Sequence, residues 1–235
     1  MIMRRSSTPA PSGSDPQGSD SWGALWKDAR RHALRTFAPV LIPLVLMWGF
    51  YIVKLATGNW INIALSLDAR SISGLVGILF MPLLHGSFSH LLGNTFSWLI
   101  LGGMTALLDR RFLLIMGLIW LLTGAILWVI GTPWLCHAPD GYDCVRRHVG
   151  ASGVIYGFGA FLVAYGFLTR RISAILVALF VLLFHGLSML AGILPLTAGS
   201  GVSWTGHLSG AIAGVVVAFL MTKEARAARA ARASP

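Results

Sequence analysis

The sequence has few charged residues, and acidic residues are the rarest of them. Only eight of the 235 residues are Asp or Glu, and none of these lies in the middle of a long apolar stretch. An intramembrane aspartyl protease needs two buried carboxylates that share a proton, and a proton-coupled carrier usually needs at least one buried acid. The sequence therefore argues against both classes. It also excludes a His-Glu-x-x-His zinc protease helix, because the only glutamate, Glu224, lies in the C-terminal tail.

Cysteine is also rare, with two residues in the whole chain. Cys136 and Cys144 both fall in a polar segment between two apolar stretches, which predicts a loop outside the membrane core. A disulfide between them is expected if that face of the membrane is oxidising, and two free thiols are expected otherwise. The sequence leaves both alternatives open.

Apolar residues dominate the chain. Hydrophobic residues make up 56% of it and charged residues 11%, and the mean hydropathy of +0.75 lies far outside the range of soluble domains. A helix needs roughly 20 residues to cross the hydrocarbon core. The uncharged stretches, with a break at Pro195 in the longest one, predict six spans near 37–56, 88–108, 112–131, 151–169, 172–193 and 205–222. The predicted fold is an all-α polytopic membrane protein, a bundle of six transmembrane helices.

The positions of the basic residues predict how this bundle is oriented. A cytoplasmic N-terminus puts fourteen Lys and Arg residues in cytoplasmic segments and leaves Lys54, Arg70, Arg146 and Arg147 outside. Because cytoplasmic loops carry an excess of Lys and Arg, both termini are expected in the cytoplasm. The net charge of +10 is then mainly a signal of topology. A nucleic-acid partner is not expected, because the basic residues flank the spans and do not form one patch.

Three regions are expected along the chain: a cytoplasmic tail over 1–35, a membrane domain over 36–222 and a basic tail over 223–235. Residues 1 to about 20 are rich in Ser, Pro and Gly, have no periodic apolar pattern and are expected to be disordered. They also lack the features of a cleavable signal peptide. Residues 22–35 mix aromatic, aliphatic and basic residues, which predicts either a short helix on the inner leaflet or an ordinary basic flank of the first span.

Four polar side chains are expected at a similar depth in the bundle. A helical rise of about 1.5 Å per residue, counted from the charges at the inner ends of the spans, puts Ser152 about 27 Å and His207 about 24 Å from the inner boundary. The same rise puts His90 at about 28 Å and Asn94 at about 22 Å. His90 and Asn94 are four residues apart, so they share one face of their helix. These groups from three helices are expected to converge near the outer surface.

Ser152 and His207 are the candidate catalytic pair. An ionisable side chain inside a bilayer marks function more often than packing, and a hydroxyl beside an imidazole is the minimum equipment for nucleophilic peptide cleavage. Serine taken alone also packs between membrane helices without any catalytic role. Ser152, however, lies between Gly150 and Gly153, which permit a sharp turn and a close approach of substrate at a helix start with free N–H groups.

Three neighbours of this pair have expected supporting roles. Tyr156 lies one turn after Ser152 on the same face, where its ring can pack against the imidazole; the alternative is an interfacial aromatic anchor. Gly210 and Gly214 follow His207 at a spacing that allows close helix packing. This packing is expected to bring His207 within hydrogen-bond reach of Ser152.

His185 is the second candidate for the base, at about 21 Å from the inner boundary. It ranks below His207 because no close-packing glycines accompany it. Another use of the histidines is a haem or metal site built from His85, His90, His185 and His207. His90 and His207 without Cys or carboxylate support make a poor zinc site, so no metal or cofactor is expected.

Together these residues resemble the rhomboid family of intramembrane serine proteases. The segments that carry the resemblance are His85-Gly-Ser-Phe-Ser-His90-Leu-Leu-Gly-Asn94, Gly150-Ala-Ser152-Gly153 with Tyr156, and His207-x-x-Gly210-x-x-x-Gly214. In this order and on a six-helix frame they are highly specific, and the resemblance covers residues from about 37 to 222. The chain departs from it in the first outer loop, residues 57–87. Some members of the family carry a Trp-Arg pair there, whereas this chain has Gly74-Leu-Val-Gly77.

The resemblance implies a role for each matched position. Ser152 is the expected nucleophile and His207 the general base and acid, in a dyad without a carboxylate, which agrees with the scarcity of acids. His90, Asn94 and the backbone N–H of Ser152 are expected to form the oxyanion hole, and Tyr156 to support the imidazole. The further residues expected to support the site are His85, Gly150, Gly153, Gly210 and Gly214. Without an acidic residue to orient the imidazole, slow turnover is expected.

The expected function is that of an intramembrane serine endopeptidase. It hydrolyses peptide bonds in or near transmembrane segments of other membrane proteins, near the outer face of a bacterial inner membrane. The alternative is a catalytically inactive rhomboid-like protein that binds membrane clients. Substrate helices must unwind locally, because an intact helix holds its carbonyls in hydrogen bonds. The resemblance implies that the fifth span and the loop near 195–203 control lateral access. The sequence does not predict an oligomeric state.

Overall fold

The computed structural model describes residues 17–131, 147–197 and 201–233. The chain divides between Arg35 and Thr36 into two compact units, Met1–Arg35 and Thr36–Pro235. One helix, α1 (Gln17–Thr57), runs from the first unit into the second. This helix begins inside the segment expected to be disordered to about residue 20, and residues 22–35 belong to the same helix as the first span. Cys136 and Cys144 lie outside the described residues.

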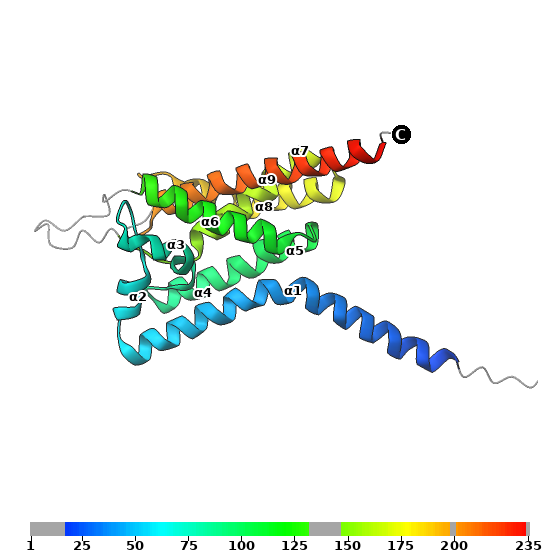
Figure 1. Ribbon diagram of the computed structural model, residues 1–235, viewed down its shortest axis with the longest axis horizontal. Helices are drawn as coiled ribbons and strands as arrows, with labels where there is room; N and C mark the ends of the chain where they lie inside the picture. The colour runs from blue at the N-terminus through cyan, green and yellow to red at the C-terminus, as the bar shows by residue number, and fades with distance from the viewer. Residues whose placement is uncertain (1–16, 132–146, 198–200, 234–235) are drawn as a thin grey trace, which may run out of the picture. The chain divides into compact units, whose positions relative to one another are not determined.

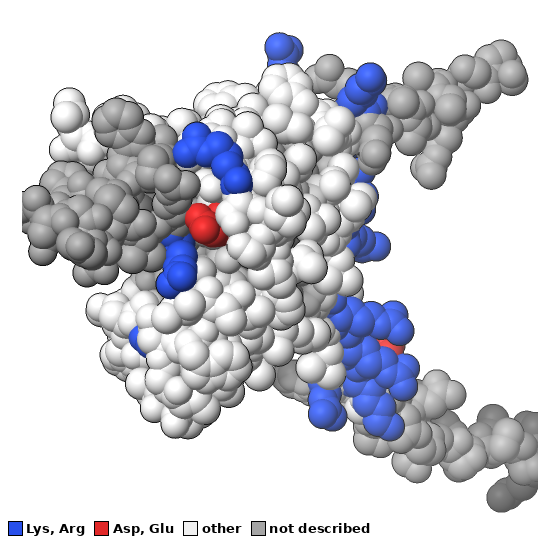
Figure 2. All heavy atoms as spheres, turned by 60° about the vertical axis from the view of Figure 1, so that its left-hand side comes forward, with Lys and Arg blue, Asp and Glu red and all other residues white. Residues whose placement is uncertain are grey.

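Six helical segments are long and apolar enough to cross a membrane. They are Trp22–Thr57, Phe88–Leu108, Phe112–Ile130, Ser152–Thr169, Ile172–Ile193 and Trp204–Lys223. The predicted all-α polytopic fold is confirmed, and five of the six spans begin and end within a residue or so of their predicted bounds. Most described residues on the face shown in Figure 2, which brings the left-hand side of Figure 1 forward, carry no charge.

The second span is built from three consecutive pieces: α4 (Phe88–Ser97), a π-helical turn η3 (Trp98–Gly102) and α5 (Gly103–Leu108). The remaining spans are α6 (Phe112–Ile130), α7 (Ser152–Thr169), α8 (Ile172–Ile193) and α9 (Trp204–Ala233). In Figure 1 the spans of the second unit run from side to side, with α2 and α3 at the left-hand end. That end, which also carries the start of α7, is called the Ser152 end below, and the other is called the Arg170 end.

Helix α7 forms the centre of the bundle, and glycines let α9 pack directly against it. A Cβ atom added at Gly210 would collide with the carbonyl oxygen of Gly153, and one added at Gly214 would collide with the carbonyl oxygen of Gly157. The predicted close packing of the fourth and sixth spans is therefore present. On the other side of α7, Phe158 packs edge-on against Trp98 of the second span, and both rings are fully buried.

The segment between the first two spans folds into short elements at the Ser152 end. They are α2 (Trp60–Leu65), β1 (Leu67–Asp68), η1 (Ser73–Val76), α3 (Gly77–Phe80) and η2 (Met81–Leu83). Strand β1 pairs antiparallel with β2 (Arg147–His148), which precedes α7. Side chains at Gly74 and Gly77 would collide with the backbones of Asp68 and Leu67. Gly74 and Gly77 thus let this part of the loop pack directly against the backbone of β1. They lie in the loop where the sequence departs from the Trp-Arg pattern.

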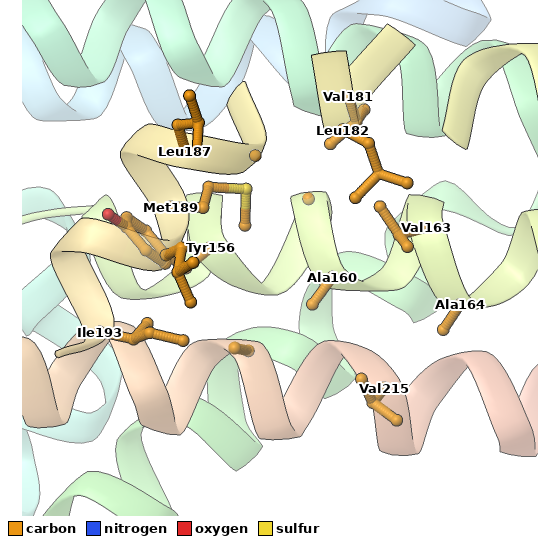
Figure 3. A pocket seen from close by; sticks show the side chains of 14 residues that line it. Tyr156, Ala160, Val163, Ala164, Val181, Leu182, Leu187, Met189, Ile193 and Val215 are labelled. Atoms are coloured by element: carbon orange, nitrogen blue, oxygen red, sulfur yellow. The ribbon is translucent and has the colours of Figure 1, made fainter. Parts of the chain in front are cut away.

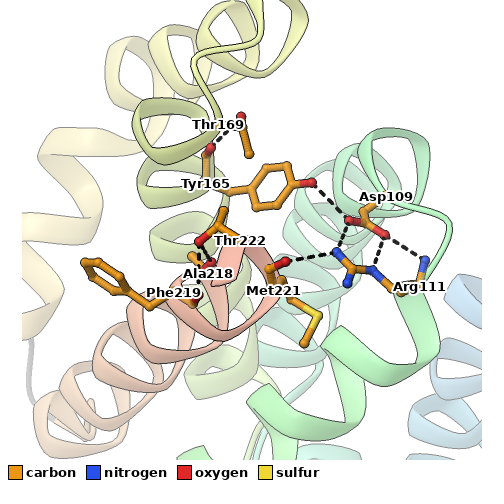
Figure 4. Close-up of polar contacts among 8 residues, drawn as sticks. All are labelled: Asp109, Arg111, Tyr165, Thr169, Ala218, Phe219, Met221 and Thr222. Carbon is orange, nitrogen blue, oxygen red and sulfur yellow. Dashed lines mark hydrogen bonds and ion pairs between the residues drawn. The ribbon is translucent and has the colours of Figure 1, made fainter. Parts of the chain in front are cut away.

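A polar cluster at the Arg170 end joins three parts of the bundle (Figure 4). The Asp109 carboxylate accepts hydrogen bonds from the Arg111 guanidinium at 2.9 Å and from the Tyr165 hydroxyl at 3.0 Å. Arg111 also donates to the carbonyl of Met221 on α9 at 3.4 Å. Burial favours the neutral form of Asp109, but the hydrogen bonds and charge of Arg111 outweigh it and hold the pKa of Asp109 below its ordinary value. The cluster therefore ties the turn between α5 and α6 to α7 and α9.

Candidate active site

The structure brings Ser152 and His207 into direct contact. Ser152 is the first residue of α7, His207 lies in the first turn of α9, and 2.9 Å separate Ser152 Oγ from His207 Nε2. The turn before α7 depends on Gly150, whose φ of 117° lies in the region that favours glycine. The N–H of Gly150 donates to the carbonyl of Met81 at 2.9 Å. This turn presents the serine hydroxyl to α9.

A backbone carbonyl fixes the orientation of the imidazole. His207 Nδ1 lies 3.0 Å from the carbonyl oxygen of Gly192, at the end of α8. A carbonyl oxygen only accepts hydrogen bonds, so Nδ1 carries the hydrogen and Nε2 of the neutral ring is left as an acceptor. The Ser152 hydroxyl can then donate to Nε2, which is the arrangement that a general base requires. Gly192 was not among the residues expected from the sequence, because a backbone acceptor has no side-chain signature.

Tyr156 packs face to face with His207, as its position one turn after Ser152 predicts. The two ring centroids are 3.9 Å apart and the ring planes differ by 8°. The Tyr156 hydroxyl donates to the carbonyl of Ser188 on α8 at 3.2 Å. A Cβ atom at Gly192 would collide with this hydroxyl and lie 3.0 Å from His207 Nδ1. The imidazole is therefore held between α7 and the end of α8, where only glycine fits.

His90 and Asn94 border the turn that leads into Ser152. A Cβ atom built on Gly150 would lie 2.7 Å from His90 Nε2 and 3.5 Å from Asn94 Nδ2. Both side chains come from α4, one helical turn apart, and their polar ends thus reach the backbone just before the serine. Within the described part of the chain, the His90 ring nitrogens make no hydrogen bond to the protein. The His90 ring is thus free to donate to a group bound at this turn.

His85 holds Asn94 in place. His85 is 1% exposed, and its Nε2 lies 2.9 Å from Asn94 Nδ2 while its Nδ1 lies 3.4 Å from the carbonyl of Leu83. Burial, with a smaller contribution from the nearby His90, lowers the pKa of His85 to about 3, so the ring is neutral at pH 7. Nδ1–H then donates to Leu83 and Nε2 accepts from the Asn94 amide. One amide hydrogen of Asn94 is used in this way, and the other remains for the site.

The histidine that competes for the role of base does not reach the serine. His185 lies on α8, where its ring centroid is 6.4 Å from that of Phe180, and within the described residues it makes no contact with Ser152. Across 17–131, 147–197 and 201–233, no three His, Cys, Asp or Glu side chains are grouped so that they could hold a metal ion. The hydrogen-bond geometry therefore favours His207 over His185 as the partner of Ser152. The predicted depths of the two residues did not separate them.

A second polar contact, which the sequence reasoning missed, fixes the start of α9. His148 Nδ1 lies 2.8 Å from Ser203 Oγ. Ser203 Oγ also accepts from the Gly206 N–H at 3.1 Å, and the Ser203 carbonyl accepts from the His207 N–H at 3.1 Å. Ser203 thus caps the helix that carries His207. Burial lowers the pKa of His148 to about 4, against the opposing charge of Asp68. A serine just before an apolar span is a signal of such a cap.

Comparisons with known proteins agree with this architecture. Residues 72–224 match the Rhomboid domain family. The chain is 41% identical over 158 residues to uncharacterized proteins of Mycobacterium bovis and Mycobacterium tuberculosis, a region that is 67% of this chain and 63% of theirs. An uncharacterized protein of Mycobacterium leprae is 37% identical over 156 residues, 66% of this chain and 59% of its own. The match thus spans less than two thirds of these relatives. Because the Rhomboid domain match covers most of the chain, the chain belongs to the rhomboid family.

Proposed function

We propose that this protein is an intramembrane serine endopeptidase that cleaves other membrane proteins in or near their transmembrane segments. The observation that carries the proposal is the 2.9 Å contact between Ser152 Oγ and His207 Nε2. It joins two membrane-spanning helices of a rhomboid-family chain, and the only hydrogen-bond acceptor on the far side of the imidazole, within the described residues, is the carbonyl of Gly192.

In the proposed mechanism His207 acts first as a base. Nε2 takes the proton of the Ser152 hydroxyl while Oγ attacks the carbonyl carbon of the scissile peptide bond, and a tetrahedral intermediate forms. The imidazolium then gives this proton to the leaving amine, and an acyl-enzyme remains. A water molecule, deprotonated by Nε2, releases the second product. The positive ring is stabilised by the Gly192 carbonyl on Nδ1–H and by the π-face of Tyr156.

Three donors are proposed to stabilise the negative oxygen of the tetrahedral intermediate. They are the backbone N–H of Ser152, which is the first residue of α7, the ring of His90 and the free amide hydrogen of Asn94. The N–H groups of a first helical turn have no partner within the helix, and the helix dipole favours negative charge there. The hydrogen bond from Asn94 to His85 preorganises one of these donors. Loss of one such donor typically costs about 100- to 1000-fold in rate.

We propose that the Ser152 end faces the outside of a bacterial inner membrane, with both chain termini in the cytoplasm. This orientation is supported by the sequence, which puts fourteen Lys and Arg residues in the segments predicted to be cytoplasmic and four in those predicted to lie outside. Substrates enter from the bilayer and must unwind locally, because carbonyls in an intact helix are held in hydrogen bonds. Water must reach the site for the acyl-enzyme to be hydrolysed, and the outer face supplies it.

The test is cleavage of a substrate with a single transmembrane span by purified protein in lipid vesicles. Wild type is expected to release the fragment and Ser152→Ala to release none. Ser209→Ala is the matched control, because Ser209 is fully buried on α9 and donates only to the carbonyl of Thr205 within its own helix. Labelling of Ser152 by a fluorophosphonate gives an independent readout of the nucleophile. Equal cleavage by Ser152→Ala, or binding of the substrate without cleavage by wild type, would contradict the proposal.

A further inference from the structure

An apolar cavity of about 550 Å³ lies between α7, α8 and α9 (Figure 3). Its floor is formed by small residues, among them Ala160 and Ala164 of α7 and Ala211 of α9. Longer aliphatic side chains of α8, such as Leu187 and Leu190, form its outer wall. All three helices are among the apolar membrane spans, so the cavity lies at the depth of the hydrocarbon core.

The chemistry of the walls requires a hydrocarbon occupant. Apart from the thioether of Met189, the only polar side-chain atom that the described residues contribute to the lining is the hydroxyl oxygen of Tyr156. That hydroxyl already donates to the carbonyl of Ser188. An ordered water needs two to four polar partners, which these walls do not provide. A polar ligand would lose its hydration without gaining hydrogen bonds in return.

The size and shape of the cavity distinguish between two hydrocarbon occupants. A cavity of roughly 150 Å³ lined by apolar side chains is enough to hold a benzene molecule, so a single side chain of a substrate would leave most of this cavity empty. The lining of α7 runs from Tyr156 to Ala164, about 12 Å at the helical rise, and that of α8 runs from Val181 to Ile193, about 18 Å. The cavity is thus an elongated slot parallel to the helices, which suits an extended acyl chain.

The slot opens towards the bilayer between α8 and α9. Helix α8 packs much more extensively on α7 than on α9, and the wall residues Leu187 and Leu190 are 83% and 52% exposed. Both residues belong to a membrane span, so their exposed surface faces lipid tails. Phospholipid is the hydrocarbon present there in greatest amount, and its acyl chains run along the same direction as the slot.

One end of the slot reaches the groups that hold His207. Tyr156 belongs to its lining and also stacks face to face on the imidazole, with 3.9 Å between the ring centroids. Ile193 also lines it and follows Gly192, whose carbonyl accepts from His207 Nδ1. We propose that the slot binds one acyl chain of a membrane phospholipid, and that the bound chain holds Tyr156 and the end of α8 in the positions that orient His207. Binding stands on the cavity alone, whereas its effect on catalysis rests on the proposed protease function.

The first test counts the phospholipids retained by the purified full chain in detergent, by native mass spectrometry. The double variant Ala160→Leu with Ala164→Leu fills the slot, and Ala125→Leu is the control, because Ala125 is exposed on α6, outside the lining. Wild type, Ala125→Leu and Ser152→Ala are expected to retain one phospholipid more than the filled variant. Equal counts in the wild type and the filled variant overturn the proposal. So does release of the retained lipid from Ser152→Ala by a saturating single-span substrate, because the slot would then be a substrate site.

The second test uses the unaltered chain, so it does not depend on the folding of a variant. Wild type stripped of lipid in detergent is expected to react with a fluorophosphonate at least about fivefold more slowly, the lower end of typical coupling between two sites. Added phospholipid is expected to restore the rate. An unchanged rate after stripping overturns the coupling to His207. Failure of the protease proposal looks different, because labelling and cleavage are then absent while lipid is still retained.

Discussion

The substitution Gly192→Ala tests whether a backbone carbonyl of α8 orients the His207 imidazole, the proposed base. The new Cβ atom would collide with the Tyr156 hydroxyl, and would lie 2.8 Å from Tyr156 Cζ and 3.0 Å from His207 Nδ1. Carbon atoms in favourable contact are about 3.5–4.0 Å apart, so the tyrosine ring must move by about 0.7–1.2 Å. The ring stacks on His207, and the imidazole must therefore move with it or lose its support.

A displacement of this size has a large expected effect on the reaction. Misplacement of a reacting group by about 1 Å costs on the order of 100-fold in rate, or about 2.7 kcal/mol in activation free energy. We expect Gly192→Ala to lower kcat for single-span substrates by about that factor and to leave KM nearly unchanged, because the collision lies behind the imidazole. The rate of fluorophosphonate labelling is expected to fall in parallel.

Two further variants make the test specific. Gly117→Ala on α6 gives the same gain in helix propensity, and the new methyl group meets no described residue within 4 Å beyond the adjoining backbone of its own helix, so it is expected to keep the wild-type rate. Removal of the hydroxyl by Tyr156→Phe in the Gly192→Ala background relieves the closest collision and is expected to recover part of the activity. Wild-type kcat in Gly192→Ala, with the substitution verified, would refute the argument that this carbonyl and ring position the base.

Three other predictions follow from contacts around the site. Asn94→Ala is expected to lower kcat by about 100- to 1000-fold with the thermal unfolding temperature preserved; a full wild-type kcat would remove Asn94 from the oxyanion hole. Gly210→Ala is expected to destabilise the fold by about 1–3 kcal/mol, measured by denaturation in detergent, because its methyl group collides with the carbonyl of Gly153; unchanged stability would contradict the close packing. The pKa of His148 is about 4 in the folded protein and 6.5 ordinarily, so the unfolded chain binds the proton more tightly and stability falls as the pH drops from 6.5 towards 4. His148→Gln is expected to flatten this part of the stability profile, and an equally steep profile would argue against a buried neutral ring.

The sequence predicted the membrane architecture closely because charge in a bilayer is expensive. Uncharged stretches bounded by Lys, Arg and Asp mark the spans almost directly, and α6, α7 and α8 begin or end within one residue of the predicted bounds. The short elements between the first two spans were not predicted, since two- to six-residue pieces have no measurable periodicity. The π-helical turn at Trp98–Gly102 leaves no sequence signal either.

Site residues inside the apolar spans could be predicted from the sequence, because polar side chains are rare there. Those in the polar loops could not. Ser152, His207, His90 and Asn94 stand out because polar side chains inside spans are few. Gly192 contributes only a backbone carbonyl, which every residue has, so the sequence does not mark it. His148 and Ser203 lie in segments between the spans, where polar residues are common. To distinguish His207 from His185 as the base, one must know how α7 packs against α9. The close approaches at Gly210 and Gly214 determine that packing.

The contact between Ser152 and His207 joins residues 55 positions apart, on the fourth and sixth spans, and this separation has a consequence for biogenesis. Chains are synthesised from the N-terminus at about 5–20 residues per second, so the serine reaches the membrane several seconds before its histidine. During that interval the hydroxyl has no imidazole partner, so the proposed protease would be inert towards its neighbours in the insertion machinery. On the proposed function, assembly of the last helix is therefore also the step that activates the enzyme.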